Sequence, residues 1–219
     1  MKTSKLLLCL AMVAAALSAA AWYYPALPAK VPVHWNMHGE ADGFAARSII
    51  WLLGPGLMLV VLLLGYLLPK LSPKRFDIAP FKATFEYFIV VLVALSGYLF
   101  VLTLAAMLGR GWPMQQAIPA GLFVVLILLG NPMGKVQPNF YVGIRTPWSL
   151  ASPKVWRATH RLAGQMMVAC GVLGLLAMAL GSPPALLVVP GLLWAMVAVL
   201  YSLWHYKKLE QSGRLADGS

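Results

Sequence analysis

Charged side chains are scarce in this 219-residue chain, and acidic ones are the scarcest. Only 11% of the residues are Asp, Glu, Lys or Arg, and only six are acidic. A soluble domain has about 25% charged and about 45–50% apolar residues, whereas 61% of this chain is apolar. A chain of this length cannot bury so much apolar surface in its own core. The low charge therefore excludes a soluble globular protein and indicates one that is solvated by lipid.

Ionisable residues are also missing from the middle of the apolar runs. A helix that spans a bilayer needs about 20 mostly apolar residues, and six runs are candidates: Leu6–Trp22, Ile49–Leu68, Phe85–Leu108, Ala117–Gly130, Leu162–Gly181 and Ala185–Trp204. The fourth run is short and reaches this length only with its flank from Met114. Ion-coupled pumps usually keep ionisable groups near the bilayer midplane, so a coupled transporter is disfavoured. Glu86 lies at a helix end, where Lys82 is its expected surface partner.

Cysteine and catalytic motifs are nearly absent as well. Cys9 and Cys170 both lie within apolar runs, so the sequence predicts small buried residues and gives no sign of a disulfide framework or a thiolate metal site. The sequence contains no nucleophile–base pair, no phosphate-binding loop and no helix with metal-ligand spacing. We therefore expect neither enzyme activity nor a cofactor.

The charge that is present lies mostly on one side of the expected membrane. The net charge is +11, and with a cytosolic amino terminus all but three of the 17 basic residues lie in inside segments. The exceptions are Lys30, Arg47 and Arg110. This asymmetry is the positive-inside rule, so the charge predicts orientation rather than direct binding of nucleic acid. The predicted fold class is an all-α polytopic bundle of about six transmembrane helices with both termini in the cytosol.

The first apolar run leaves two interpretations open. Its amino-terminal lysines and the stretch "ALSAAA" are typical of a cleaved signal peptide. Alternatively, Ala11, Ala15 and Ala19 recur at four-residue spacing, which suits close packing against another helix. We favour a retained span.

The polar stretch at residues 23–48 is expected to form a short extended or hairpin-like cap on the outer membrane surface. Apolar and polar residues alternate over Val33–His38, which is strand periodicity. Gly39 and the Asp42-Gly43 pair supply turn chemistry. The imidazoles and carboxylates here suggest zinc, but ligand spacing in a flexible loop predicts little, and we expect no metal.

The largest inside loop, residues 131–161, is expected to form a cytosolic elbow that lies along the membrane. Its four prolines forbid one continuous helix. Ser152 followed by Pro153 predicts a helix start, because Ser caps free N–H groups and Pro suits the first turn. This helix should run into the fifth span and carry four residues on one face, namely Arg157, His160, Arg161 and Gly164.

Two stretches resemble a known family. "PNFYVGIRTPWSL" (138–150) followed by "VWRATHRLAG" (155–164) strongly resembles the SdpI family, which comprises bacterial membrane proteins named for immunity to a secreted sporulation-delaying toxin. "LPAKVPVHWNMHGEADGF" (27–44) resembles the amino-terminal domain of unknown function that often precedes that region. The resemblance implies an amino-terminal domain at residues 1–69, an SdpI-like domain at residues 70–219, and a multi-pass location in the bacterial cytoplasmic membrane.

Candidate site residues follow from the same motifs at both ends of the chain. In the outer loop they are His34, Asn36, Gly39, Asp42 and Gly43, which we expect to meet a toxin. In the inner loop they are Pro138, Asn139, Gly143, Arg145, Thr146, Pro147, Trp148, Trp156, His160 and Arg161. The Arg145 fork could hold an acidic partner or a lipid phosphate. Asn139 is expected to tie the loop, and the two tryptophans to anchor at the membrane interface.

The resemblance implies protection against a toxic peptide made by sibling cells. It also implies signalling, in which the protein holds a small winged-helix repressor at the membrane. The expected partners are the lipid bilayer, a peptide or protein toxin and that cytosolic repressor. Two other classes stay open: a small-molecule permease or exporter without ion coupling, and an assembly or structural factor for membrane proteins.

Overall fold

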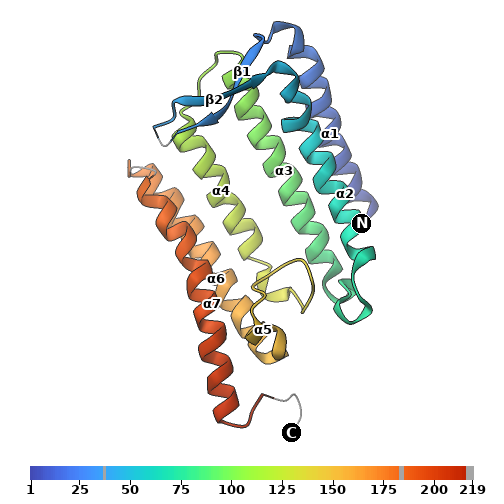
Figure 1. The fold of residues 1–219 in the computed structure, drawn as a ribbon, viewed down its shortest axis with the longest axis vertical. Helices are drawn as coiled ribbons and strands as arrows, with labels where there is room; N and C mark the ends of the chain where they lie inside the picture. Colours follow the sequence, from blue (N-terminus) through green and yellow to red (C-terminus); the bar gives the residue numbers. More distant parts are fainter. Residues whose placement is uncertain (37, 183–184, 216–219) are drawn as a thin grey trace.

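A helical bundle closed at one end by a β-hairpin makes up the protein (Figure 1). The computed structural model covers residues 1–219 and describes all of them except 37, 183–184 and 216–219, with only the backbone described at 75 and 185–192. The helices are α1 (Thr3–Tyr23), α2 (Leu57–Leu71), α3 (Lys82–Met107), α4 (Met114–Gly130), α5 (Pro147–Ala151), α6 (Pro153–Ala179) and α7 (Ala185–Gln211). The strands are β1 (Lys30–Trp35) and β2 (Ala41–Ala46).

Helix length and composition confirm an all-α polytopic membrane protein. Among the described residues, five segments are long and apolar enough to cross a membrane: Thr3–Ala26, Arg47–Leu71, Ala79–Met107, Met114–Lys135 and Pro153–Ala179. Their outer faces carry large exposed apolar side chains such as Leu63, Val101 and Leu173, which form the kind of apolar surface that lipid rather than water covers. The sixth expected span, 185–204, falls in α7, whose first side chains lie outside the described residues.

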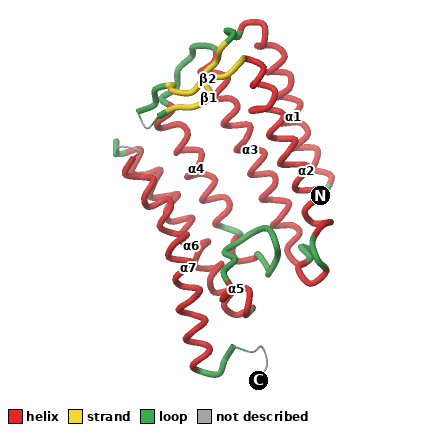
Figure 2. The backbone as a smooth tube through the Cα atoms, in the orientation of Figure 1, coloured by secondary structure: helices red, strands yellow, loops and turns green. Residues whose placement is uncertain are grey.

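The polar segments gather at the two ends of the bundle. The β-hairpin and the connection between α3 and α4 lie at one end, and residues 72–81, residues 131–152 and the end of α7 lie at the other (Figures 1 and 2). The strands pair antiparallel, which confirms the hairpin expected in the outer loop. The segments with most of the 17 basic residues lie at the end opposite the hairpin. The positive-inside rule associates such an end with the cytosol.

Helix α1 packs against α3 through a different stripe of residues from the predicted one. The buried positions are Cys9, Val13, Ala16 and Ala20, whereas Ala15 is exposed. The prediction from Ala11, Ala15 and Ala19 was wrong because four-residue spacing of alanine identifies a stripe but does not show which stripe faces a neighbour. Cys9 and Cys170 form no disulfide with each other. Retention of α1 as a span stays a prediction.

The expected surface pair of Lys82 and Glu86 is also wrong, because Glu86 is buried. Lys5 Nζ on α1 lies 3.5 Å from Glu86 Oε2 and donates to the carbonyl oxygen of Ala83 at 2.9 Å. A buried carboxylate needs a counter-charge. The contact therefore fixes the start of α1 against the first turns of α3.

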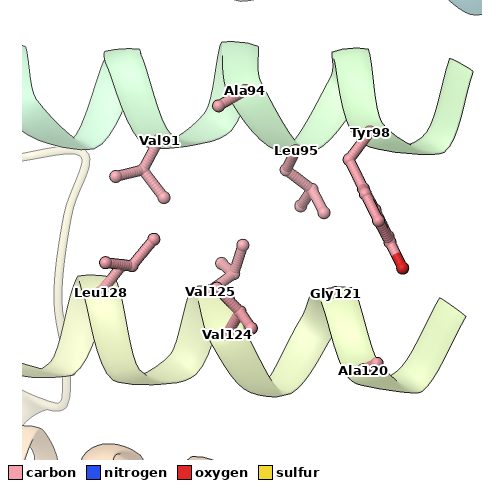
Figure 3. Close-up of a pocket in the computed structure, with 9 residues that line it drawn as sticks. All are labelled: Val91, Ala94, Leu95, Tyr98, Ala120, Gly121, Val124, Val125 and Leu128. Atoms are coloured by element: carbon pink, nitrogen blue, oxygen red, sulfur yellow. The ribbon is translucent and has the colours of Figure 1, made fainter. Parts of the chain in front are cut away.

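The two halves of the bundle meet along α3 and α4. Helices α1 and α2 contact α3, while α6 contacts both α4 and α7. The Tyr98 hydroxyl on α3 donates to the carbonyl oxygen of Ala117 on α4 at 2.7 Å. Gly121 leaves room for this ring, since a Cβ there would lie 2.4 Å from it. An apolar groove of about 280 Å³ follows the junction, with the side chains of α3 and α4 facing each other across it (Figure 3).

We predict that Ala16→Leu destabilises the protein, because Ala16 is buried in the core cluster and the added carbons must displace its neighbours. Overpacking of this kind costs about 1–3 kcal/mol of the free energy of unfolding. Ala15→Leu adds the same atoms at an exposed position and should change little. Thermal unfolding in detergent measures both variants, and equal midpoints would contradict the buried stripe described above.

Candidate functional site

The loop of residues 136–146 precedes α5 at the end of the bundle opposite the hairpin (Figure 2). It folds around one buried side-chain amide. Asn139 is 1% exposed. Its Oδ1 accepts hydrogen bonds from the backbone N–H groups of Tyr141 and Val142, both at 2.7 Å. Its Nδ2 donates to the carbonyl oxygens of Gln137 and Val142 at 2.8 and 2.9 Å. All four bonds stay within the loop, so Asn139 sets the shape of the loop rather than tying it to the bundle.

The ring of His160 holds this loop against α6. Nδ1 bonds the carbonyl oxygen of Trp156 at 2.8 Å, and Nε2 accepts the backbone N–H of Ile144 at 2.9 Å. A carbonyl can only accept and an N–H can only donate, so the fully buried ring is neutral with its proton on Nδ1. Protonation of Nε2 would remove the acceptor for Ile144.

Trp156 adds a second attachment one turn earlier on α6. Its indole N–H donates to the carbonyl oxygen of Val136 at 2.7 Å. Its ring stacks on His160 with centroids 4.0 Å apart and planes 20° apart. Both side chains are fully buried. Helix α6 thus holds the start of the loop at Val136 and its end at Ile144.

Gly143 is required where the loop meets the His160 ring. Its φ is +118°, in the region that favours glycine. A Cβ at this position would lie 2.1 Å from His160 Nε2. The missing side chain is what lets the next N–H reach the ring.

Thr146 joins the loop to α5 and α7. It is the N-cap residue of α5, where its Oγ1 accepts the N–H of Ser149 at 3.1 Å and its own N–H bonds Ser149 Oγ at 3.0 Å. Thr146 Oγ1 also lies 2.8 Å from Ser202 Oγ on α7, and Ser202 Oγ donates to the carbonyl oxygen of Val199. Since Ser202 uses its proton there, Thr146 donates to Ser202. One hydroxyl therefore connects three elements.

Because the loop backbone is fixed, the Arg145 side chain is held in a defined position on the protein surface. The Arg145 side chain is exposed, and its Cζ lies 5.0 Å from the ring centre of Phe140. Phe140 is itself 41% exposed and meets Phe76 edge-on at 5.0 Å. Arg145 forms no ion pair with any residue that the structure describes. We call Phe140 and Arg145 the inner surface pair; Pro138 and Trp148 are half-buried near it and Pro147 is exposed.

Two expectations for α6 are wrong. Arg157 and Arg161 are exposed, but His160 and Gly164 are buried, so the predicted face is split. Arg157 and His160, at i and i+3, point about 60° apart around the helix axis. The boundary between the buried and the exposed side of α6 passes between these two directions. Trp156 is not an interface anchor either, because it is fully buried.

The start of α6 was predicted correctly, although not its capping bond. The helix begins at Pro153, with Ser152 in the N-cap position. The Ser152 hydroxyl makes no capping hydrogen bond and instead donates to the carbonyl oxygen of Leu215 at 3.4 Å. Proline at the first helical position is enough to define this start.

At the opposite end, all five outer candidates meet in the hairpin. Asn36 Oδ1 accepts the N–H groups of His38 and Glu40 at 2.9 and 3.0 Å, and its Nδ2 donates to Glu40 Oε2 at 2.9 Å. Gly39 turns the chain with φ +82°. These contacts make Asn36 and Gly39 the residues that form the turn.

The strands place His34 beside Asp42 on the exposed side of the hairpin. His34 Nδ1 and Asp42 Oδ1 are 2.5 Å apart. Gly43 pairs with His34, and a Cβ on Gly43 would lie 2.7 Å from the His34 Cβ. Among the described residues, no three His, Cys, Asp or Glu side chains are placed to hold a metal ion.

Several residues that build the site were missed from the sequence. Ser149, three residues after Thr146, has the spacing of a capping pair and could have been found. Ser202, Gln115 and Trp35 could not, because their contacts join distant elements. Gln115 of α4 lies under Gly39, and Trp35 packs against Leu102 and Met114 at the ends of α3 and α4.

The fold and its two ends define a multi-pass helical membrane protein with a hairpin cap at one end and a clamped loop at the other. Residues 135–202 match the model of the SdpI/YfhL protein family, and residues 11–67 match the model of the domain of unknown function DUF1648. The chain is 29% identical over 191 residues to the "Immunity protein SdpI" of Bacillus subtilis (strain 168). This alignment covers 86% of this chain and 89% of that protein.

No solved structure matches the chain. The hairpin cap and parts of α1 and α2 lie within the DUF1648 match, and the clamped loop with α5 and α6 lies within the SdpI match. The chain is therefore similar to the SdpI/YfhL family over residues 135–202 and to DUF1648 over residues 11–67.

We predict that Gly143→Ala opens the inner loop, since the new Cβ would displace the His160 ring. Gly109→Ala is the matched control, because Gly109 also has a positive φ, +71°, but has nothing within 4 Å of its Cβ position. Limited trypsin digestion in detergent, read as cleavage after the exposed Arg145, should be accelerated several-fold in Gly143→Ala only. Equal cleavage of the two variants would contradict the clamp.

Proposed function

We propose that the protein protects the cell that makes it against a secreted or membrane-active toxin, from a position in the bacterial cytoplasmic membrane. The observation that carries the proposal is the similarity to a protein named for immunity, which extends over 86% of this chain. The SdpI family is not a known family of enzymes. We therefore propose that protection results from binding rather than from catalysis.

The hairpin is the surface that we assign to the toxin. The asymmetry of the basic residues supports an orientation in which the hairpin faces outward, where a secreted toxin arrives. His34 and Asp42 are the exposed polar pair that the hairpin presents, with side chains 71% and 47% exposed. Asn36 and Gly39 support them by forming the turn, so their contribution to binding would be indirect.

The inner surface pair is the part of the proposal that concerns signalling. Arg145 and Phe140 stand on a loop that α6 holds through His160 and α7 through Thr146. A movement of either helix would carry the pair with it. A ligand shifts such an equilibrium only by the difference in its affinity for the two arrangements. We propose that this surface recruits a cytosolic repressor of the winged-helix type, for which the exposed guanidinium fits an acidic patch.

The test is survival in the presence of the toxin. A strain that lacks the gene is exposed to culture supernatant of its parent, which must kill an unrelated sensitive strain. It is complemented with wild type, His34→Ala or His38→Ala, after equal membrane abundance has been verified. His38 is a second exposed imidazole on the same hairpin without a hydrogen bond of its side chain to a described residue. We expect wild type and His38→Ala to restore survival. His34→Ala should lower the number of surviving cells at least about tenfold, because the loss of about 1.4 kcal/mol of binding free energy weakens the affinity for the toxin tenfold.

The outcomes separate the two parts of the proposal. If the deletion strain survives as well as its parent, the immunity function is wrong. If the strain dies but all three complements rescue it equally, immunity holds and the assignment of His34 is wrong. The signalling part is tested separately: membranes with Arg145→Ala should retain less of the repressor than membranes with Lys74→Ala, which removes an exposed charge at the same end.

A further inference from the structure

An open groove of about 590 Å³ lies between α4 and α6, on a part of the molecule that the proposed function does not use. Its polar end, at the side of the inner loop, is formed by Asn131, Arg161 and Gln165. Its other end is formed by Val168, Ala169 and Val172. The groove therefore changes from cationic and polar to apolar along α6, and none of the described residues that line it is acidic.

Glycines shape the floor of this groove. A Cβ on Gly164 would lie 2.5 Å from the carbonyl oxygen of Gly130, so α4 and α6 touch there through their backbones. Gly134 lies over Arg161, and a Cβ at Gly134 would be 3.7 Å from the Arg161 Cα. These glycines have no side chains that could fill the space. The backbones of α4 and α6 therefore determine the shape of the groove, and a change of side-chain rotamer would not close it at these positions.

The depth of the groove matches one leaflet of a bilayer. From Arg161 to Val172, α6 rises about 16 Å at about 1.5 Å per residue. Half of the hydrocarbon core is about 15 Å thick. Arg161 is the last charged residue of α6, which continues uncharged to Ala179. With Arg161 at headgroup level, the apolar end of the groove reaches the middle of the membrane.

We propose that this groove binds an anionic phospholipid of the leaflet on the inner-loop side. The guanidinium of Arg161 binds the phosphate, and one acyl chain lies along Val168, Ala169 and Val172. Charge complementarity supports this occupant, because Arg161 is exposed and forms no ion pair with a described residue. Arginine binds phosphate oxygens through two parallel N–H groups, and Asn131 and Gln165 supply further donors for the headgroup.

The experiment uses the full chain purified in a neutral detergent. Its thermal unfolding midpoint is measured with phosphatidylglycerol, with phosphatidylcholine of the same chains and with inorganic phosphate. We expect phosphatidylglycerol to raise the midpoint by about 5 °C and the other two additives to change it by much less. An equal shift with phosphatidylcholine would show detergent-like solvation, and an equal shift with phosphate would show a site for a free anion. Either result overturns the proposal.

Matched variants locate the site. Arg161→Gln should lose the shift, whereas Arg157→Gln, which removes an exposed charge one turn earlier on α6, should keep it. Ala169→Phe should reduce the shift by filling the apolar end, whereas Leu173→Phe enlarges an exposed residue that does not line the groove. Each variant is compared with its own midpoint without lipid. A full shift in Arg161→Gln, or an equal loss in Arg157→Gln, would overturn the assignment.

Discussion

The hydrogen bond from the Ile144 N–H to His160 Nε2 is the contact on which the inner end of this protein depends. A neutral imidazole has one donor and one acceptor, and the second nitrogen of His160 is used by the carbonyl of Trp156. The loop forms no helix or strand that could supply hydrogen-bond partners for its backbone, so the ring provides the acceptor that the Ile144 N–H needs. An unsatisfied buried N–H would cost about 1–3 kcal/mol. Because the ring is fixed, the loop is fixed, and the exposed Arg145 stands in a defined position.

The turns at the two polar ends of the bundle are closed in the same way, by an asparagine side chain and a nearby glycine, although they pack against different helices. Asn36 in the hairpin and Asn139 in the inner loop each accept two backbone N–H groups on one amide oxygen. A glycine with positive φ follows within four residues in both cases. Short polar side chains of this type close turns without strands or helices. The outer turn rests on α4 through Gln115, whereas the inner loop is attached to α6 through His160 and to α7 through Thr146.

Local signals in the sequence were enough for the class of the protein, the hairpin and the start of α6 at Pro153. The composition shows that lipid must surround much of the chain. The alternation of apolar and polar residues in the hairpin and the Ser-Pro step before α6 each involve only a few neighbouring residues, so they can be recognised in the sequence. The faces of α1 and α6 were predicted wrongly for one shared reason. Ala15 and Ala16, or His160 and Arg161, are neighbours in the chain, and only the position of another helix decides which of them is buried. The Thr146–Ser202 contact joins residues 56 apart, and no short-range pattern encodes it.

Hydrogen exchange at the Ile144 amide tests the clamp most directly. The full chain in detergent is compared with His160→Phe, which keeps a flat ring against Trp156 but removes the acceptor. The clamp predicts slow exchange at Ile144 in the wild type and exchange at least tenfold faster in His160→Phe, the factor that corresponds to about 1.4 kcal/mol. The Asn139-bonded amides of Tyr141 and Val142 provide the internal reference. Rapid exchange of Ile144 in the wild type, or the same rate in both proteins, would contradict the account.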